Sequence, residues 1–419
     1  MHFADQSQSA SNGMEKKYLI VNNGSASGKY AIYKETGEKI ISAHLELDEK
    51  DYICTFEMND LSDSINISKS DFEDGLNFSL SNFISRGALK DKKEICAVGV
   101  RVVAPGLYFL ENKITDSVYE KKMLEAREKA PLHISMTIED VRRLKKIFNK
   151  IPIVGISDSS FHESMSKSVE RYAISKEITE KYEVQRYGYH GISVKSILFK
   201  LGGMLGPLPR RIIICHLGGG VSITAVKDCK SFETSMGFTP LEGAVMATRA
   251  GDIDPGAISY LSEKLGIAGE KLRDFLNNKC GLLGVSGKSS SVKDLFKLES
   301  EGDKDAKLAL DIYVHRIKKY IGAYHTVMGG TDMLIFSATV GERSFLMRNR
   351  ICEGLDVLGI RIDKDKNERS EGINSDITGT GSRTKVMVVK TDEMTQIARD
   401  MRSILSGKPE PLGCGIFSK

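Results

Sequence analysis

Between Arg211 and Pro255 the chain alternates apolar runs with glycine-rich turns. Ile212–Cys215 is a β-branched apolar run with the length of a buried strand. Three glycines follow, then the alternating stretch 221–226, a short turn and the stretch 231–234. We predict three strands joined by a glycine turn and a tight turn. Glycines between strands let backbone N–H groups approach a ligand, usually a phosphate, although a plain hairpin has the same pattern.

The same order of elements stands near the start of the chain. An apolar run at 17–21, a glycine-containing loop at 22–29, a strand pattern at 30–33, a turn at 35–38 and a longer strand pattern at 40–47 follow one another. We therefore predict an internal duplication in which each half begins with a β-meander. The first loop is not a P-loop, because it is one residue short and a strand pattern, not a helix, follows it.

The rest of the chain mixes strands and helices. We predict further strands at 94–103, 151–156, 333–336 and 385–389, and helices at 121–129, 137–150, parts of 166–183, 256–264, 269–278, 303–328 and 393–405. Thr137 is the expected N-cap of the second of these helices.

Length and charge narrow the class of protein. A chain of 419 residues favours two domains, and no low-complexity linker separates them. The 60 basic and 56 acidic residues nearly balance, which argues against a nucleic-acid or membrane-surface partner. Residues 1–16 are polar, so we expect a disordered leader and no secretory signal. Seven scattered cysteines indicate reduced thiols and a cytoplasmic protein.

The stretch after the second meander carries candidate chemistry. It reads TSMGFTPLEG and then TRAGDIDP, which places an arginine and two aspartates among glycines and prolines. With VNNGSASGKY, VRVV, APLH, DSSFH, RYGYHGIS, HLGGG and VGERS, these segments occur in the order found in acetate kinases. From Tyr18 to about Ala398 the chain resembles acetate kinase and its short-chain acyl kinase relatives, within the sugar kinase, heat-shock protein and actin superfamily.

The resemblance implies an α/β fold of two duplicated actin-like, ribonuclease H-like domains with a cleft between them. Domain I would comprise 17–160 plus 393–419, and domain II 161–392, with nucleotide and dimer contacts in domain II. The implied reaction is reversible transfer of a phosphoryl group from ATP to acetate, with propionate as the second choice. Mg²⁺ is the implied metal, with Mn²⁺ as an alternative, and the implied assembly is a homodimer.

A carboxylate acceptor is already ionised at neutral pH, so this reaction needs no general base. It needs cations that bring two anions together in line. By resemblance, Arg101 and Arg249 hold the carboxylate and the phosphoryl group, and His190 donates a hydrogen bond to the phosphoryl oxygens. Asp158 orients the arginines or the metal, and His133 is a second histidine of smaller effect. Ordinary ion pairs and a satisfied loop histidine are the alternatives.

The resemblance assigns the remaining site residues by function. The apolar acyl pocket would be Val103, Leu132, Tyr189 and Pro240. The phosphate and nucleotide contacts would be Asn22, Ser25, Ser27, Lys29, His216, Gly218, Gly219, Gly220, Ser291, Lys293, Thr339, Gly341 and Arg343. The magnesium contacts would be Asn22 and Glu393.

Departures from the family pattern cluster on the donor side. Gly219 replaces an asparagine, Thr339 a glycine and Arg343 an asparagine, and residues 291–293 replace an aspartate, an aromatic residue and an arginine. Nearer the acyl end, two histidines are lost at 100 and 104, and Tyr189 replaces the usual phenylalanine. Three interpretations remain open: drift within an ATP enzyme, another donor such as pyrophosphate, or a non-catalytic binding protein. Retention of the residues assigned to chemistry argues against the last.

Overall fold

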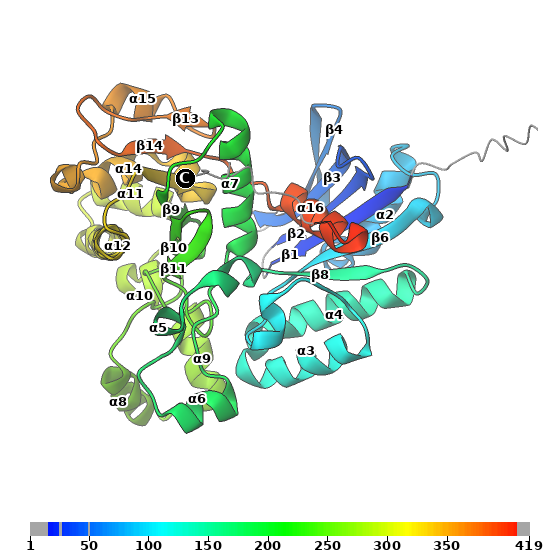
Figure 1. Ribbon diagram of the computed structural model, residues 1–419, viewed down its shortest axis with the longest axis horizontal. Helices are drawn as coiled ribbons and strands as arrows, with labels where there is room; N and C mark the ends of the chain where they lie inside the picture. Colours follow the sequence, from blue (N-terminus) through cyan, green and yellow to red (C-terminus); the bar gives the residue numbers. More distant parts are fainter. Residues whose placement is uncertain (1–15, 25–26, 49–50, 409–419) are drawn as a thin grey trace, which may run out of the picture.

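The computed structural model describes residues 16–24, 27–48 and 51–408, except the side chains of Asp48, Leu132 and His133. Two β-sheets form two bodies that lie side by side, with helix α7 and helix α16 where they meet (Figure 1). No helix among the described residues is both long and apolar enough to span a membrane.

The first sheet has eight strands in the order β5-β4-β3-β2-β1-β6-β8-β7, and the second has six in the order β11-β10-β9-β12-β14-β13. The strands of the first are β1 Lys17–Asn23, β2 Ser27–Lys34, β3 Lys39–Asp48, β4 Asp51–Met58, β5 Leu61–Ile67, β6 Ile95–Val102, β7 Lys113–Ile114 and β8 Ile153–Ser157. Those of the second are β9 Arg211–Leu217, β10 Val221–Lys227, β11 Lys230–Thr234, β12 Met333–Ser337, β13 Ser375–Asp376 and β14 Lys385–Val388.

The helices fall before, between and after the sheets. They are α1 Lys69–Glu73, α2 Gly75–Ser85, α3 Ser117–Lys129, α4 Pro131–Ile147, α5 Lys167–Glu170, α6 Lys176–Tyr182, α7 Gly191–Leu205, α8 Pro255–Leu265, α9 Gly269–Asn278, α10 Gly281–Ser286, α11 Val292–Ser300, α12 Lys304–Met328, α13 Ala338–Arg343, α14 Phe345–Cys352, α15 Lys364–Glu368 and α16 Glu393–Ser406. Short 3₁₀ segments occur at Lys92–Glu94, Leu107–Leu110, Ser160–Ser164 and Leu355–Leu358.

The two sheets share one topology, as the predicted duplication requires. In the first sheet β1, β2 and β3 form an antiparallel meander, and β6 and β8 continue from β1 in parallel. In the second sheet β9, β10 and β11 form the meander, and β12 and β14 continue from β9 in parallel. The parallel strands are almost wholly buried because helices cover both faces.

Helices α7 and α16 join the two bodies. Ile397 and Met401 of α16 pack in one apolar cluster with Ile20 of β1, Ile156 of β8 and Ile192 of α7. An ion pair of 2.6 Å joins Lys195 of α7 to Asp400 of α16. The last helix therefore lies on the first sheet although its sequence follows the second (Figure 1).

Two expectations about local structure are wrong. The helix expected at 137–150 begins at Pro131, and Thr137 is buried inside it and not its N-cap. Proline fits the first turn of a helix because its missing N–H has no intrahelical acceptor there. Within the described part of the chain, five cysteines are free thiols as expected, but Cys229 is disulfide-bonded, since spacing along a sequence does not reveal which thiols meet in the fold.

Gly155 in β8 tests how tightly the first sheet packs on its helices. A Cβ added there would overlap the hydroxyl of Tyr119 in α3 and lie 2.7 Å from its ring carbon Cζ. We expect Gly155→Ala to lower the free energy of unfolding by about 2–3 kcal/mol, measured by urea denaturation. Gly203→Ala in α7, where an added Cβ meets nothing within 4 Å, is the control and should raise stability by up to about 1 kcal/mol. Equal stability of the two variants would contradict this packing.

Candidate functional site

Two parallel strands of the first sheet place an arginine and an aspartate together. Arg101 stands near the end of β6, and Asp158 follows the end of β8. Because these strands are parallel neighbours, their carboxyl ends meet at one edge of the sheet, and Arg101 Nη2 lies 3.0 Å from Asp158 Oδ2. Burial opposes the ionisation of Asp158, but the charge and hydrogen bond of Arg101 outweigh it and hold the pKa of Asp158 below its usual value.

Asp158 also fixes the histidine loop that leads into α7. The backbone N–H of His190 donates to Asp158 Oδ2 at 2.9 Å, and the N–H of Gly191 donates to the Asp158 carbonyl at 2.8 Å. His190 has a φ of 60°, which is a strained conformation for a residue with a side chain. Such strain persists only where surrounding contacts determine it, and the buried carboxylate supplies them.

The His190 ring is held as a neutral group. Its Nδ1 lies 3.0 Å from Ser222 Oγ of β10, and it stacks on His216 of β9 with ring centroids 4.1 Å apart. Burial and then the nearby His216, Arg101 and Arg249 lower the pKa of His190 well below its usual value. In the tautomer in which Ser222 donates to Nδ1, the ring proton is on Nε2, which lies beside the glycine turn.

The three glycines between β9 and β10, Gly218 to Gly220, are not needed for positive φ, because none of them has a positive φ. Gly220 is needed for close approach: an added Cβ would lie 3.3 Å from His190 Nε2 and 3.4 Å from Arg249 Nη1. Gly219 faces open space, with nothing within 4 Å of an added Cβ. The turn therefore packs on His190 and Arg249 at Gly220 and has open space at the preceding Gly219.

Arg249 is a cation without a carboxylate partner among the described residues. Its Nη1 donates to the carbonyl of Pro240 at 3.3 Å. Burial and the nearby charge of Arg101 lower its pKa. Two guanidinium groups thus lie close together with Asp158 as the carboxylate paired to one of them, an arrangement suited to anionic ligands.

These groups line one cavity of about 340 Å³ where the two bodies meet. It is lined by Asn23, Gly24, Arg101, Val103, Met136, Thr137, Asp158, Tyr189, His190, Gly220, Pro240, Arg249, Asn277 and Asn278. Four buried polar atoms at this cavity have no protein partner: Asn23 Oδ1, Arg101 Nε, Asp158 Oδ1 and Asn277 Oδ1. Buried polar atoms are almost always hydrogen-bonded, so this concentration indicates a ligand site.

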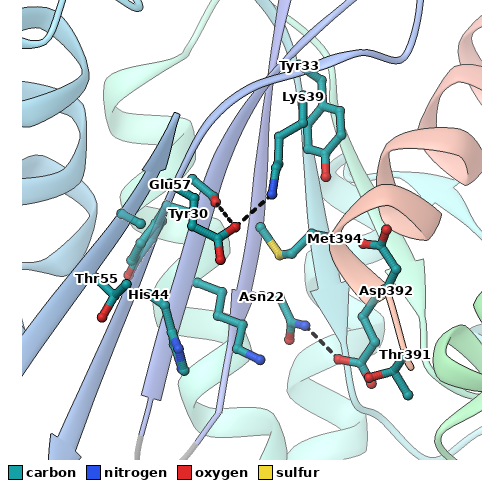
Figure 2. Close-up of a pocket in the computed structure, with 14 residues that line it drawn as sticks. Asn22, Tyr30, Tyr33, Lys39, His44, Thr55, Glu57, Thr391, Asp392 and Met394 are labelled. Atoms are coloured by element: carbon teal, nitrogen blue, oxygen red, sulfur yellow. Dashed lines mark hydrogen bonds and ion pairs between the residues drawn. The ribbon is translucent and has the colours of Figure 1, made fainter. Parts of the chain in front are cut away.

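A second cavity of about 330 Å³, lined in part by Asn22, lies between the first meander and the start of α16 (Figure 2). Asn22 Nδ2 donates to Glu393 Oε2 at 2.8 Å, and Arg101 Nη1 approaches Asn22 Oδ1 at 3.4 Å. Lys29 and Lys39 also line this cavity, and Lys39 pairs with Glu57 at 2.9 Å. Asn22 therefore lines the second cavity and contacts Arg101, which lines the first.

The residues at Asn22 fit a magnesium ion better than a metal held only by protein. The described residues contain no cluster of three or more histidine, cysteine, aspartate or glutamate side chains suited to a metal. Glu393 offers one carboxylate next to the Asn22 side chain, whose Nδ2 donates to Glu393 Oε2 and whose Oδ1 accepts from Arg101. Mg²⁺ commonly binds through one or two carboxylates, with waters and substrate phosphates completing its shell.

Eleven of the expected site residues line one or the other of the two cavities, and nine described ones line neither. Arg101, Val103, Asp158, Tyr189, His190, Gly220, Pro240 and Arg249 line the first cavity, and Asn22, Lys29 and Glu393 the second. Nine other expected residues whose positions are described line neither cavity: Ser27, His216, Gly218, Gly219, Ser291, Lys293, Thr339, Gly341 and Arg343. Ser25 and the side chains of Leu132 and His133 lie outside the described part of the chain.

The donor-side residues differ in their setting. Ser291 caps α11, accepting from the N–H of Asp294 at 3.3 Å, while Lys293, Thr339 and Arg343 are exposed. The turn into α13 nevertheless lies against the glycine turn, since an added Cβ on Gly218 would be 3.6 Å from the Ala338 Cβ. The segment 338–343 therefore lies beside the glycine turn of the second meander, although it lines neither cavity.

Sequence reasoning missed several groups at the site. Asn277 and Asn278 end α9 and line the first cavity, but no motif marks them. His162 is fully buried beneath the loop, with Nε2 3.0 Å from the Tyr189 carbonyl and Nδ1 2.8 Å from Ser231 Oγ. The segment DSSFH contains His162 and could have drawn attention to it.

Known proteins resemble this chain over almost its whole length. The acetokinase family model matches residues 17–399. The chain belongs to the acetokinase family. It is 38% identical to an acetate kinase of Caldanaerobacter subterraneus over 400 residues, covering 93% of this chain and 99% of that one. Members of this family transfer a phosphoryl group to a carboxyl group, and this chain is such a phosphotransferase.

Solved structures of acetokinases share the fold. The acetate kinase of Porphyromonas gingivalis matches with a TM-score of 0.81 at 34% identity, covering 93% of this chain and all of that one. A propionate kinase of Francisella tularensis matches with a TM-score of 0.82 at 33% identity, covering 92% and 98%. The expected α/β architecture of two actin-like halves is confirmed.

His162 should make the stability of the protein depend on pH. Burial lowers its pKa to about 4, whereas an unfolded histidine titrates near 6.5. As the pH falls through the pKa of the histidine in the unfolded chain, the unfolded chain binds a proton at His162 that the folded chain does not bind. Between about pH 7 and pH 5, His162 should therefore cost about 2 kcal/mol of unfolding free energy.

The variant His162→Gln removes the titrating group and keeps an amide donor for the Tyr189 carbonyl. Its loss of stability between the two pH values, measured by urea denaturation, should be smaller than that of the wild type by this amount. Parallel pH profiles in the two proteins would contradict the assignment.

Proposed function

We propose that the protein transfers the terminal phosphoryl group of ATP to acetate, reversibly and with magnesium, to give acetyl phosphate and ADP. The observation that carries this proposal is the pairing of Arg101 and Arg249 with a neutral His190 around one cavity. Two cations and a hydrogen-bond donor converge there on a space bounded by apolar Val103 and Pro240. This set suits a small carboxylate beside a phosphoryl group.

In this mechanism acetate binds already ionised. Arg101, fixed by Asp158, holds the carboxylate, while Val103, Tyr189 and Pro240 surround its methyl group. Arg249 and His190 Nε2 act on the oxygens of the transferring phosphoryl group, whose charge they stabilise in flight. No residue has to remove a proton, which agrees with a cleft built from arginines and a histidine kept neutral.

Magnesium would be held by Glu393 and Asn22, directly or through water. When bound, it supplies positive charge that neutralises the donor phosphates. Lys29 and Ser27 on β2, with the backbone of the Gly218–Gly220 turn, would contact those phosphates from opposite bodies. His216 supports His190 through the stack and is itself held by Ser193 Oγ at 2.8 Å.

The nucleoside end of ATP would lie toward Ser291, Lys293, Thr339, Gly341 and Arg343. A second candidate donor is pyrophosphate, because Arg343 is an exposed cation at a position where the family pattern has an asparagine. Pyrophosphate is compact and highly charged and would need no nucleoside contact.

The division into 17–160 plus 393–419 and 161–392 is proposed as the pair of bodies that close over the substrates. Closure would exclude water, which competes with acetate for the phosphoryl group. We also propose a cytoplasmic homodimer with its interface in the second body.

The function is tested by the formation of acyl hydroxamate from acetate, ATP, magnesium and hydroxylamine. The purified wild type should give product, and Arg249→Ala should lower kcat by at least about a hundredfold because a cation at the transferring group is lost. Pyrophosphate in place of ATP decides the donor. No product with any donor would leave the proposal without support, and near-normal turnover in Arg249→Ala would contradict its role.

Gly219 offers a second test of the donor site. Because its position has open space and ordinary φ, Gly219→Asn fits without strain and restores a side-chain donor near the phosphates. We expect the KM for ATP to fall about three- to tenfold, the effect of one added hydrogen bond. Gly220→Ala is the control, because its Cβ would press on His190 and Arg249 and should lower kcat instead. An unchanged KM in Gly219→Asn would argue against phosphates at this turn.

A further inference from the structure

Pro240 lines the first cavity at the end of the segment Gly237–Pro240 (the wall segment), and two tyrosine hydroxyls hold the backbone of this segment. Tyr172 Oη accepts from the N–H of Phe238 at 2.8 Å. Tyr189 Oη donates to the carbonyl of Phe238 at 2.8 Å. Both polar groups of one peptide residue are therefore fixed by side chains from an adjoining segment, and Pro240 follows two residues later in the cavity wall.

Tyr172 is itself held by Glu242 and, through it, by Arg186. Its hydroxyl donates to Glu242, which pairs with Arg186 Nη2 at 2.5 Å. Arg186 Nη1 also donates to the carbonyls of Thr234 and Met236, at 3.0 Å and 3.2 Å. The residues that flank the wall segment on both sides are thus anchored to one guanidinium group.

Packing alone does not hold the wall. Phe238 also lines a separate groove of about 580 Å³ on the other side, together with Pro105, Gly106 and Val184. A wall with open space behind it is free to retreat unless hydrogen bonds restrain it. The hydroxyl of Tyr189 is such a restraint, because it donates to the Phe238 carbonyl.

We propose that the Tyr189 hydroxyl is a specificity-determining group that keeps the acyl end of the cavity short. By fixing the Phe238 carbonyl it holds Pro240 forward, so that a two-carbon carboxylate fits and a three-carbon carboxylate does not. The inference rests on the proposed function for its substrates. It concerns the selection of the acceptor and not the transfer step, since the hydroxyl faces the wall and not the arginines.

The test is the ratio of kcat/KM for propionate to kcat/KM for acetate in Tyr189→Phe. We expect this ratio to rise at least about fivefold, mainly through a lower KM for propionate, because the discrimination of one methylene depends on how firmly a pocket resists it. A ratio measured on one preparation does not depend on the fraction of folded protein. Tyr172→Phe, which removes the acceptor for the Phe238 N–H, should shift the ratio in the same direction.

Tyr187→Phe is the matched control. It removes a hydroxyl that donates to a backbone carbonyl, that of Glu183 at 2.5 Å, and its ring stays near Phe238, with centroids 6.0 Å apart. The control should leave the ratio as in the wild type. An unchanged ratio in Tyr189→Phe, or an equal rise in Tyr187→Phe, would overturn the proposal.

Calorimetric titration of both acids without a donor repeats the comparison without turnover. Tyr189→Phe should then show the same gain in relative affinity for propionate. Failure of the wild type to form acyl phosphate would reject the proposed function, whereas an unchanged affinity ratio in the variant would reject this inference separately.

Discussion

The carboxylate of Asp158 is the group on which the rest of the site depends. One of its oxygens receives both a guanidinium N–H of Arg101 and the backbone N–H of His190, so it ties β6 of the first sheet to the loop that enters α7. Its burial makes the pairing essential, since a buried charge that loses its partner costs several kcal/mol. The same contact fixes the position of one arginine and the strained backbone of the histidine.

The cleft carries positive charge that its own carboxylate does not balance. Arg249 has a lowered pKa because it is buried near Arg101, and His190 stays neutral partly because two arginines are close. Holding these two like charges near each other lowers the free energy of unfolding, and functional sites commonly carry such a cost. An anionic substrate relieves that repulsion between the arginines. The negative charge on the oxygens of the transferring phosphoryl group relieves it further, and a preorganised site favours a transition state in this way.

Much of the fold could be predicted because burial leaves a pattern. The buried strands β1, β9 and β12 are β-branched or apolar runs, and the glycine turns mark the meanders. Strand β5 was not predicted because it is exposed at nearly every position, so no face of it is marked by apolar residues. The Arg101–Asp158 pair follows from the shared edge of parallel strands, but Asn277 reaches the cavity through a helix whose placement no local pattern encodes.

The link between Asn22 and Glu393 spans 371 positions of sequence. Every strand of both sheets is complete before α16 leaves the ribosome, yet Ile20 and Ala97 share their apolar cluster with Ile397 and Met401 of that helix. A nascent chain thus carries an uncovered apolar patch until its final helix docks. The contact between Asn22 and Glu393 forms in that same event, so it cannot be made until α16 has docked on the first sheet.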